Sequence, residues 1–342
     1  MIFVIRIPYP VSRIPYSVFR IPSVVCRLSS ATGGIYKLDL DKQPAQLVRL
    51  YADVATVQVG DRMVECTIRG RLFRDDPPAV GDFVQIERVG DGWAIKGILP
   101  RKSVLARRAA GPAHAKQVLI ANVDQVVVVF SAGLPALTLP TLDRFLVVVE
   151  ANELLARIVI NKMDLAPREG IAALMQPYVE AAYPVHFTSA ETGEGLDELR
   201  AGLAGKESVL VGPSGVGKSS LLNSLYPDLQ LNLKVGRLSD AYGKGRHTTV
   251  GGFLIRLPDG ARVADTAGLR EVGLWLVPPD ELPYCFPEFE PYLGKCQFNN
   301  CAHLTEPGCA VRAALEQGKI YPSRYESYVK LRAEAAESWP RW

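Results

Sequence analysis

Residues 44–105 alternate between apolar and polar side chains in several short stretches. The clearest are Ala55–Val59, Met63–Ile68, Asp82–Ile86 and Trp93–Ile98. Turn signals such as Gly60-Asp61 and Gly90-Asp91-Gly92 separate them, and a period of two is typical of strands with one buried face. About five such strands favour a small all-β barrel, with an OB-fold as the leading candidate, and barrels of this kind often bind nucleic acid.

From Val118 onward, short apolar runs alternate with segments of helical period. The expected strands are Val126–Phe130, Ile158–Ile160, Val185–Phe187, Val209–Val211, Phe253–Leu257 and Val263–Ala264. The expected helices are Leu142–Asn152, Ile171–Ala182, Gly195–Leu203 and Lys218–Leu225, and two more near the C-terminus are Val311–Gln317 and Ser323–Glu337. Strands that alternate with helices predict a mainly parallel α/β sheet.

Residues 6–26 repeat one unit three times, as RIPYPVS, RIPYSVF and RIPSVVC. The proline near the start of each unit disfavours a long helix or a central strand. We interpret residues 1–38 as a non-structural extension, for example from a misassigned start. An Arg-rich organellar transit peptide and a membrane-surface or RNA-binding arm are the alternatives.

Composition sets limits on the number of domains and on the partners. A chain of 342 residues, of which 48% are hydrophobic, can form two or three domains with buried cores. No apolar run reaches the roughly 18 residues of a membrane span, so none is predicted. Residues 1–38 carry five of the cations and no acid, which leaves 3 − 5 = −2 for the rest of the chain. The net charge of +3 therefore indicates no particular partner.

An acid-free stretch runs from Gly92 to Val123 beside the predicted barrel. Its cations are Lys96, Arg101, Lys102, Arg107, Arg108 and Lys116. Such a strip can contact the phosphates of RNA. We predict RNA contacts for Arg101, Lys102, Arg107 and Arg108, and a solvated linker is the alternative.

The strongest motif is a complete phosphate loop between an apolar strand and a helix. We assign nucleotide binding to Gly212, Pro213, Ser214, Gly215, Val216, Gly217, Lys218, Ser219 and Ser220. Glycines let backbone amides approach the phosphates, and the helix N-terminus favours negative charge. Lys218 is expected to reach the β- and γ-phosphates as part of the catalytic machinery, and Ser219 to bind Mg²⁺.

The sequence Asn161-Lys162-Met163-Asp164 predicts a guanine base. The Asp164 carboxylate can accept two hydrogen bonds from guanine, whereas adenine offers no such pair of donors. The stem of Lys162 can pack on the face of the base. Thr188-Ser189-Ala190 comes after another predicted strand and is expected to support the guanine, with the Ala190 amide on the base oxygen.

A second strand ends at Asp265-Thr266-Ala267-Gly268. Asp265 is expected to hold Mg²⁺ through water, and the Gly268 amide to sense the γ-phosphate. Thr248 or Thr249 is a further candidate ligand for Mg²⁺. The glycine-rich loop before these threonines would then become ordered with GTP.

These motifs stand in an unusual order. The guanine motifs precede the phosphate loop, whereas conventional GTPases place them after it. Circular permutation preserves a core when the original termini lie close together. It also places the switch segments at the C-terminal end of the GTPase domain, where they adjoin the last 70 or so residues of the chain.

That C-terminal segment contains Cys296-x4-Cys301-x-His303-x5-Cys309. Three thiolates and one imidazole complete the tetrahedral set of a structural Zn²⁺ site. The close spacing indicates metal binding in a reducing compartment rather than a disulfide framework. Cys26, Cys66 and Cys285 are interpreted as buried or incidental thiols, which is also the alternative for the cluster.

The combination of barrel, permuted GTPase motifs and zinc cluster resembles the bacterial RsgA (YjeQ) family of GTPases that depend on the small ribosomal subunit. The resemblance spans roughly residues 44–340. It also rests on Val80-Gly81-Asp82, Pro100-Arg101-Lys102, Asn122-Val123-Asp124-Gln125 and Gly245-Arg246-His247-Thr248-Thr249.

The resemblance implies a cytoplasmic enzyme of several domains that acts without a membrane. We expect residues 39–105 to form an OB-fold RNA-binding domain, residues 106–275 a circularly permuted GTPase domain, and residues 276–342 a small α-helical zinc-binding domain. The expected cofactors are Mg²⁺ with GTP and one structural Zn²⁺. The expected partners are GTP or GDP, the small (30S) ribosomal subunit and its 16S rRNA, with hydrolysis stimulated by the subunit and coupled to release, and the chain is expected to act as a monomer.

Two departures from conventional GTPases bear on catalysis. Leu269 stands where many GTPases have a water-orienting glutamine, so slow intrinsic hydrolysis is expected. His247 resembles the family's candidate for that role, and packing or RNA contact is the alternative. Ala267 replaces a proline that is common in the family. A nucleotide-gated RNA-binding module is the second functional hypothesis, and an ATPase, the third, conflicts with Asp164.

Overall fold

The computed structural model describes residues 45–51, 54–68, 76–108, 116–227, 253–265 and 277–339. All of them belong to the unit that runs from Leu40 to Trp342. The predictions for residues 1–38, His247, Thr248, Thr249 and Gly268 lie outside the described residues. So do the side chains of Arg107, Arg108 and Asp265, although their backbones belong to strands.

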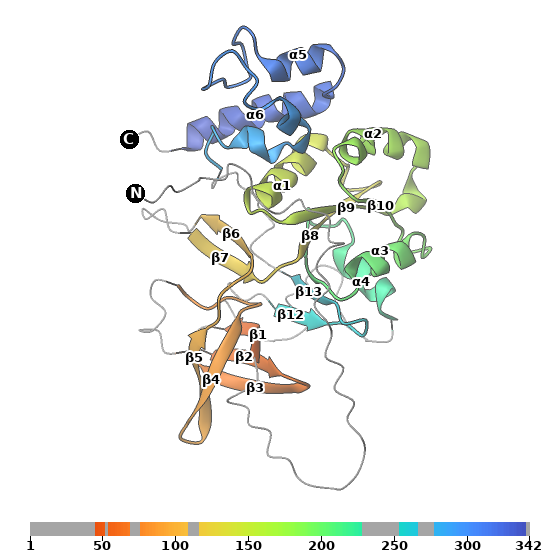
Figure 1. The fold of residues 1–342 in the computed structure, drawn as a ribbon. Coiled ribbons are helices and arrows are strands. Elements are labelled where there is room, and N and C mark those ends of the chain that lie inside the picture. The colour runs from red at the N-terminus through yellow and green to blue at the C-terminus, as the bar shows by residue number, and fades with distance from the viewer. Residues whose placement is uncertain are drawn as a thin grey trace, which may run out of the picture. The chain divides into compact units, whose positions relative to one another are not determined.

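Five short strands form the predicted barrel (Figure 1). They are β1 (Ala45–Tyr51), β2 (Val54–Val59), β3 (Arg62–Thr67), β4 (Phe83–Val89) and β5 (Gly92–Ile98). The order β1-β2-β3-β5-β4 closes because β4 also pairs with β1. Inward residues such as Leu47, Val57 and Ile95 are fully buried, as the alternating pattern requires. The prediction of a small OB-like barrel is confirmed.

A hairpin comes after the barrel, within the acid-free stretch. Its strands β6 (Val104–Arg108) and β7 (Lys116–Ala121) are antiparallel. Leu105 and Ile120 face each other across the hairpin and are both buried. Part of this stretch is therefore a folded element rather than a linker.

The α/β sheet has the strand order β10-β9-β8-β11-β13-β12. Its strands are β8 (Gln125–Ser131), β9 (Leu155–Asn161), β10 (Val185–Phe187), β11 (Glu207–Val211), β12 (Phe253–Arg256) and β13 (Arg262–Asp265). All neighbouring pairs are parallel except β12 with β13. The mainly parallel sheet is confirmed.

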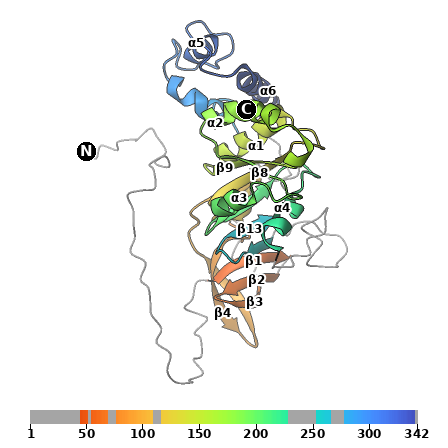
Figure 2. The ribbon, with the colours of Figure 1, turned by 90° about the vertical axis from the view of Figure 1, so that its right-hand side faces the viewer.

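Helices cover both faces of this sheet (Figures 1 and 2). They are α1 (Leu139–Ala151), α2 (Arg168–Glu180), α3 (Leu196–Leu203) and α4 (Lys218–Leu225), with a 3-10 helix at Met163–Leu165. Val126 and Val128 of β8 belong to one buried cluster with residues of α1 and α2, whereas Val127 and Val129 belong to another with residues of α3 and α4. A strand buried on both faces explains why β8 is continuously apolar in sequence.

The C-terminal part consists of two 3-10 helices, Leu282–Cys285 and Pro287–Tyr292, and of α5 (Ala310–Glu316) and α6 (Pro322–Ser338). Phe286, Phe289 and Tyr328 form its aromatic core. Val147 of α1 joins the same cluster, so this part packs on the α/β sheet's first helix. The two predicted C-terminal helices are confirmed. Among the described helices, none has the length and apolar character required to cross a membrane.

Candidate nucleotide site and metal centre

The predicted nucleotide motifs lie at the carboxyl ends of parallel strands. Asn161 ends β9, Thr188 comes directly after β10, and Gly212 comes directly after β11. Parallel strands direct these ends to one edge of the sheet, where ligands of α/β proteins bind. The chain winds from β8 outward to β10 and then returns to place β11 on the other side of β8. The loops of both halves therefore meet beside β8.

The phosphate loop has the backbone that its glycines allow. Gly212 has a φ of 137° and lies so close to β8 that a Cβ would overlap the carbonyl oxygen of Val129. Gly217, with a φ of 95°, precedes the first residue of α4, where a Cβ would collide with the amide of Asn161. The Lys218 ammonium donates to the carbonyl oxygens of Gly212 and Pro213, at 2.7 and 2.8 Å. It thus lies over the loop that would hold phosphates.

The other residues of the phosphate loop and of the first turn of α4 differ in exposure. Ser214 and Gly215 are exposed, Val216 is buried, and Ser219 and Ser220 are half-buried on the first turn of α4.

Asn161 connects the three nucleotide loops. It is almost fully buried, and its Nδ2 donates to the carbonyl oxygen of Val216 in the phosphate loop at 3.0 Å. Its Oδ1 accepts from the Thr188 hydroxyl at 3.3 Å and from the Ala190 amide at 3.2 Å. One side chain therefore holds together motifs that are 55 residues apart in sequence.

Ser189 fixes the carboxylate that is predicted to read guanine. Its buried hydroxyl donates to Asp164 Oδ1 at 2.5 Å. Asp164 itself is exposed, so its carboxylate is accessible from solvent. The Ala190 amide, predicted to bind the base oxygen, donates to Asn161 Oδ1 in this structure. A base would have to share or replace that acceptor.

Sequence reasoning missed one segment of this site, the residues after β8. The Lys162 ammonium donates to the carbonyl oxygen of Leu134 at 2.6 Å as well as to that of Gly215 at 2.7 Å. The Ala132 amide donates to the carbonyl oxygen of Asn161 at 2.8 Å. These contacts use the backbone oxygens of Leu134 and Gly215, which every residue type has. The sequence therefore gave no direct signal for the segment beyond the apolar strand that precedes it.

The four predicted metal ligands gather in the C-terminal part. The ligand atoms of Cys296, Cys301, His303 and Cys309 all lie within 4.8 Å of one another. The sulfur atoms of Cys296 and Cys309 are 4.0 Å apart, and His303 Nδ1 lies 3.5 and 3.4 Å from them. With metal–sulfur bonds of about 2.3 Å, a tetrahedral site requires edges of about 3.8 Å. The residues fit a metal ion of this kind.

Glu306 supports the loop that carries these ligands, a role that its sequence position did not reveal. Its carboxylate accepts from the backbone amides of Ala302, Leu304 and Thr305 at 2.8 to 3.0 Å. Burial alone would raise the pKa of Glu306, but its own amide and these three outweigh burial and lower the pKa to about 2. The carboxylate is therefore ionised and holds the turn around His303.

The predicted RNA-contacting cations differ from one another in the structure. Arg101 donates to both oxygens of the fully buried Asp82, at 2.6 and 2.8 Å, and to Asp76. Only 12% of its side chain is exposed, so its geometry does not support the predicted RNA contact. Lys102 is 53% exposed and pairs with Asp124 at 2.8 Å.

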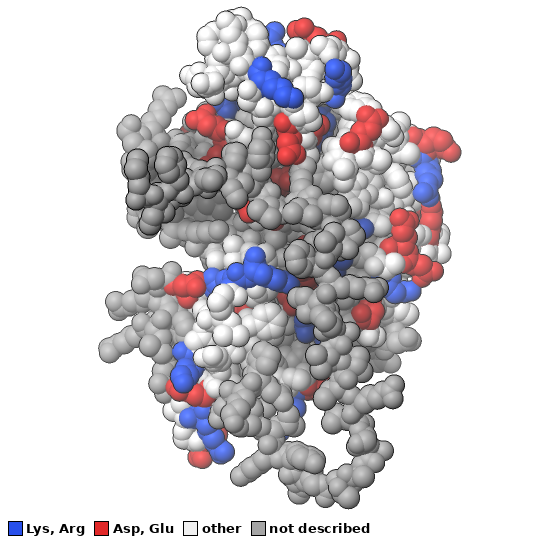
Figure 3. Space-filling view, in the orientation of Figure 1, with Lys and Arg blue, Asp and Glu red and all other residues white. Residues whose placement is uncertain are grey.

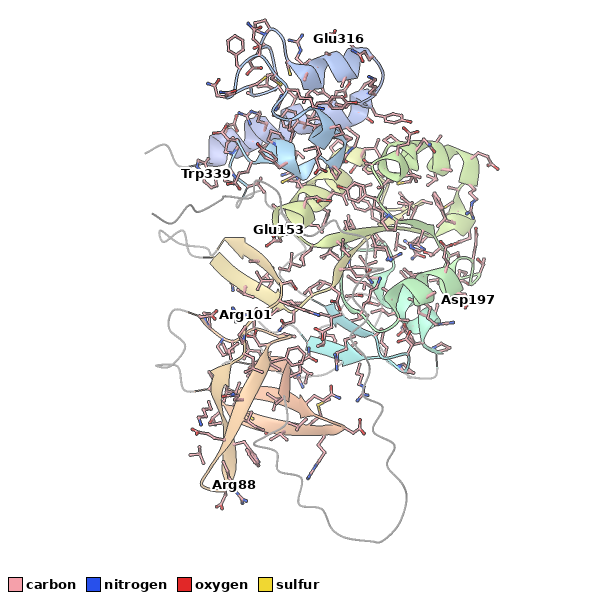
Figure 4. The ribbon with its side chains drawn as sticks, in the orientation of Figure 1. Arg88, Arg101, Glu153, Asp197, Glu316 and Trp339 are labelled. Atoms are coloured by element: carbon pink, nitrogen blue, oxygen red, sulfur yellow. The ribbon has the colours of Figure 1, made fainter. Side chains whose placement is uncertain are left out.

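Arg101 lies where the hairpin and the barrel adjoin (Figure 4). Basic side chains are visible on this face of the molecule between the barrel strands and the hairpin (Figure 3).

Comparison with known proteins identifies relatives that share one family name. Residues 98–275 match the family described as RsgA GTPase. The small ribosomal subunit biogenesis GTPase RsgA of Gemmatimonas aurantiaca is 52% identical over 282 residues, which cover 80% of this chain and 91% of that protein. The protein of the same name from Moorella thermoacetica is 43% identical over 290 residues, or 84% and 96% of the two chains.

Two solved structures resemble this fold. YjeQ from Thermotoga maritima superposes with a TM-score of 0.70 at 34% identity, covering 86% of this chain and 98% of that one. YloQ, described as a circularly permuted GTPase, gives 0.68 at 32% identity, covering 88% and 97%. This chain therefore belongs to the RsgA GTPase family of GTP-hydrolysing enzymes.

Proposed function

We propose that this protein hydrolyses GTP while bound to the small (30S) ribosomal subunit and its 16S rRNA, late in maturation of the subunit. Hydrolysis is stimulated by the subunit and coupled to release. The observation that carries the nucleotide part is the set of bonds from Asn161 to Val216, Thr188 and Ala190, which unites the guanine and phosphate motifs. The ribosomal part is supported by the names of the relatives that this chain matches over most of its length.

The proposed roles in the nucleotide site are inferred from position. Asp164 accepts from the guanine, Lys162 packs on its face, and Lys218 neutralises the β- and γ-phosphates. Mg²⁺ is proposed to be held by Ser219, Asp265 and one of Thr248 and Thr249, and Gly268 to sense the γ-phosphate. GTP supplies the phosphoanhydride that is cleaved, and the magnesium neutralises developing charge.

The proposed domain organisation places the RNA-binding barrel in residues 39–105, the permuted GTPase in 106–275 and a zinc-binding part in 276–342. The hairpin β6–β7 crosses the first of these boundaries. Three thiols and an imidazole favour zinc over harder cations. The Zn²⁺ would hold the loop from Cys296 to Cys309 in shape and leave no position for catalysis. The chain is proposed to work as a monomer in the cytoplasm.

We propose Lys102 rather than Arg101 as a contact for RNA phosphates. The ammonium of Lys102 is accessible, and exchanging its surface pair with Asp124 for a phosphate costs little. Arg107 and Arg108, on β6 of the hairpin, remain candidates.

Stimulation by the subunit tests the function directly. We expect the rate of GTP hydrolysis by the full chain to rise at least about 10-fold on adding 30S subunits, since Leu269 cannot orient water. Sedimentation with 30S subunits should require a non-hydrolysable GTP analogue and fall with GDP. An unchanged rate of GTP hydrolysis with intact 30S particles would contradict the proposal.

His247→Ala separates catalysis from nucleotide-gated RNA binding. If His247 orients the attacking water, turnover should fall about 100-fold while GTP affinity stays within about twofold. Unchanged turnover would instead support the module hypothesis.

A further inference from the structure

The segment from Ser131 to Pro135 ends β8, begins the connection to α1 and lies against the proposed guanine site. Ser131 pairs in register with Asn161 across β8 and β9. The next residue, Ala132, donates its amide to the carbonyl oxygen of Asn161 at 2.8 Å. Pro135 approaches the phosphate loop, with its Cδ 3.5 Å from where a Cβ of Gly215 would be. The segment thus contacts both halves of the site.

Lys162 is held at both ends. Its backbone has a φ of 61°, a left-handed conformation that is uncommon for a residue with a side chain. Its ammonium lies between the carbonyl oxygens of Leu134 and Gly215, at 2.6 and 2.7 Å. With both ends fixed, the four-carbon stem has little freedom left, so a base that packs on it need not immobilise it.

Ser131 supports the Leu134 carbonyl. Its side chain is fully buried, and its hydroxyl accepts from the Gly133 amide at 3.0 Å. The same hydroxyl lies 3.5 Å from the carbonyl oxygen of Leu134, to which it can donate. A larger residue would crowd this turn, because a Cβ at Gly133 would lie 2.8 Å from Leu165 Cδ1 and 3.2 Å from Leu165 Cβ. In this structure the turn directs the Leu134 oxygen to Lys162.

We propose that Ser131 is a positioning residue for guanine-nucleotide binding and acts through Lys162. The hydroxyl fixes the turn at residues 133–134, the turn fixes the ammonium, and the ammonium holds the stem as a preformed floor for the base. This rests on the proposed function, which places guanine on Lys162. Since GTP and GDP share the base, Ser131 should affect the affinity for both equally and leave the chemical step unchanged.

A double-mutant cycle tests the inference in the full-length protein. Affinities would be measured for fluorescent N-methylanthraniloyl GDP and GTP with Ser131→Ala, Lys162→Met and the double variant. We expect Ser131→Ala to raise both dissociation constants about 2- to 10-fold, the range of one hydrogen bond. It should raise KM for GTP by a similar factor with kcat unchanged. In the double variant, Ser131→Ala should add no further loss.

Two more variants complete the design. Ser103→Ala removes a part-buried hydroxyl that donates to Val123 away from the site, and it should leave both affinities unchanged. Gly133→Ala disturbs the turn while keeping the Ser131 hydroxyl, so it covers the case in which Ser131→Ala does not fold. Its effect should also disappear in the Lys162→Met background.

The outcomes are distinct. Losses from Ser131→Ala and Lys162→Met that add fully, or a fall in kcat with Ser131→Ala, would overturn the positioning role while leaving the guanine site intact. Unchanged affinity with Lys162→Met would overturn the proposed role of Lys162 in guanine binding, and the inference with it.

Discussion

At the scale of single residues, the chemistry depends on which side chains are already occupied by the protein itself. Asn161 is buried and bonded to other residues of the protein, whereas Asp164 is exposed to solvent. Arg101 and Lys102 are adjacent in sequence, yet Arg101 forms an ion pair with a buried carboxylate whereas Lys102 is accessible to solvent. Residue type alone does not separate these roles, because partners from distant segments decide them.

Asp164→Asn should change the base that is preferred. Asparagine can accept only one of the two hydrogen bonds from guanine and places an amide group against the other donor. We expect GTP affinity to fall at least about 100-fold, with partial recovery for xanthosine triphosphate, which has a carbonyl in place of the 2-amino group. Competition binding with GTP, XTP and ATP measures the change in preference. Equal affinity of the variant for GTP would contradict the assignment.

Arg101→Met and Lys102→Met form a matched pair. Removing Arg101 leaves the buried Asp82 carboxylate without its cation, so the free energy of unfolding should fall by about 3–5 kcal/mol. Removing Lys102 should cost less than about 1 kcal/mol and weaken binding to 16S rRNA. Urea denaturation and filter binding would measure the two effects. A stable Arg101 variant with lost RNA binding would restore the original prediction for Arg101.

At the scale of elements, α1 stands between the nucleotide site and the metal centre. Its N-terminal end comes after the segment that contacts Lys162. Its Asp143 is fully buried and accepts from Tyr178 and from the equally buried Arg324 of α6, which also binds Glu288. The C-terminal part is thus attached to α1 by a buried ion pair in addition to its aromatic core.

Removing the metal should loosen one part of the chain. If the four candidate ligands hold a metal, we expect a strong chelator to increase amide hydrogen exchange from Cys296 to α5, because the loop would lose the bonds that tie its ligands together. The affinity for GDP should change by less than about twofold, since the proposed guanine contacts come from β8, β9 and β10. Exchange mass spectrometry with a parallel GDP titration checks this. Unchanged exchange after verified metal loss would contradict a structural role.

At the scale of the whole unit, the barrel and the α/β sheet share one set of pairings. β1 of the barrel pairs with β12, which continues the sheet order from the barrel into the α/β sheet. Beside this pairing, Gln46 of β1 donates to the buried Glu207 at the start of β11, and Arg262 does so from β13. Glu207 therefore joins the barrel to the strand that leads into the phosphate loop.

The junction should respond to pH through Glu207. Burial raises the pKa of Glu207, although Gln46 and then Arg262 act to lower it. A carboxyl with a raised folded-state pKa binds more protons when folded, so its contribution to stability is lost as pH rises through that pKa. Each unit by which the pKa is raised is worth about 1.4 kcal/mol. Glu207→Gln should remove this dependence.

Unfolding free energies of the two proteins from pH 8 down to about pH 4, below the ordinary carboxyl pKa of 4.5, provide the measurement. As pH falls, the difference should shift in favour of the unsubstituted protein. Parallel pH profiles for the two proteins would contradict the assignment.

The sequence by itself determined the elements whose signals are local. Alternation predicted β2 to β5, continuous apolar runs predicted β8 and β9, and glycine spacing located the phosphate loop, because side-chain period and backbone freedom act over a few residues. The spacing of Cys296, Cys301, His303 and Cys309 predicted the cluster that the fold brings together. Even the permuted order could be read directly.

Only the tertiary structure decided which of these residues meet. The burial of Arg101 against Asp82 depends on a partner from another segment, and the contact of Leu134 with Lys162 uses a backbone oxygen that carries no residue-specific signal. A buried polar group forms hydrogen bonds with whichever partners the fold brings near, and those partners cannot be identified from local sequence. The roles of Ser131, Glu207 and Glu306 therefore emerged from the folded chain.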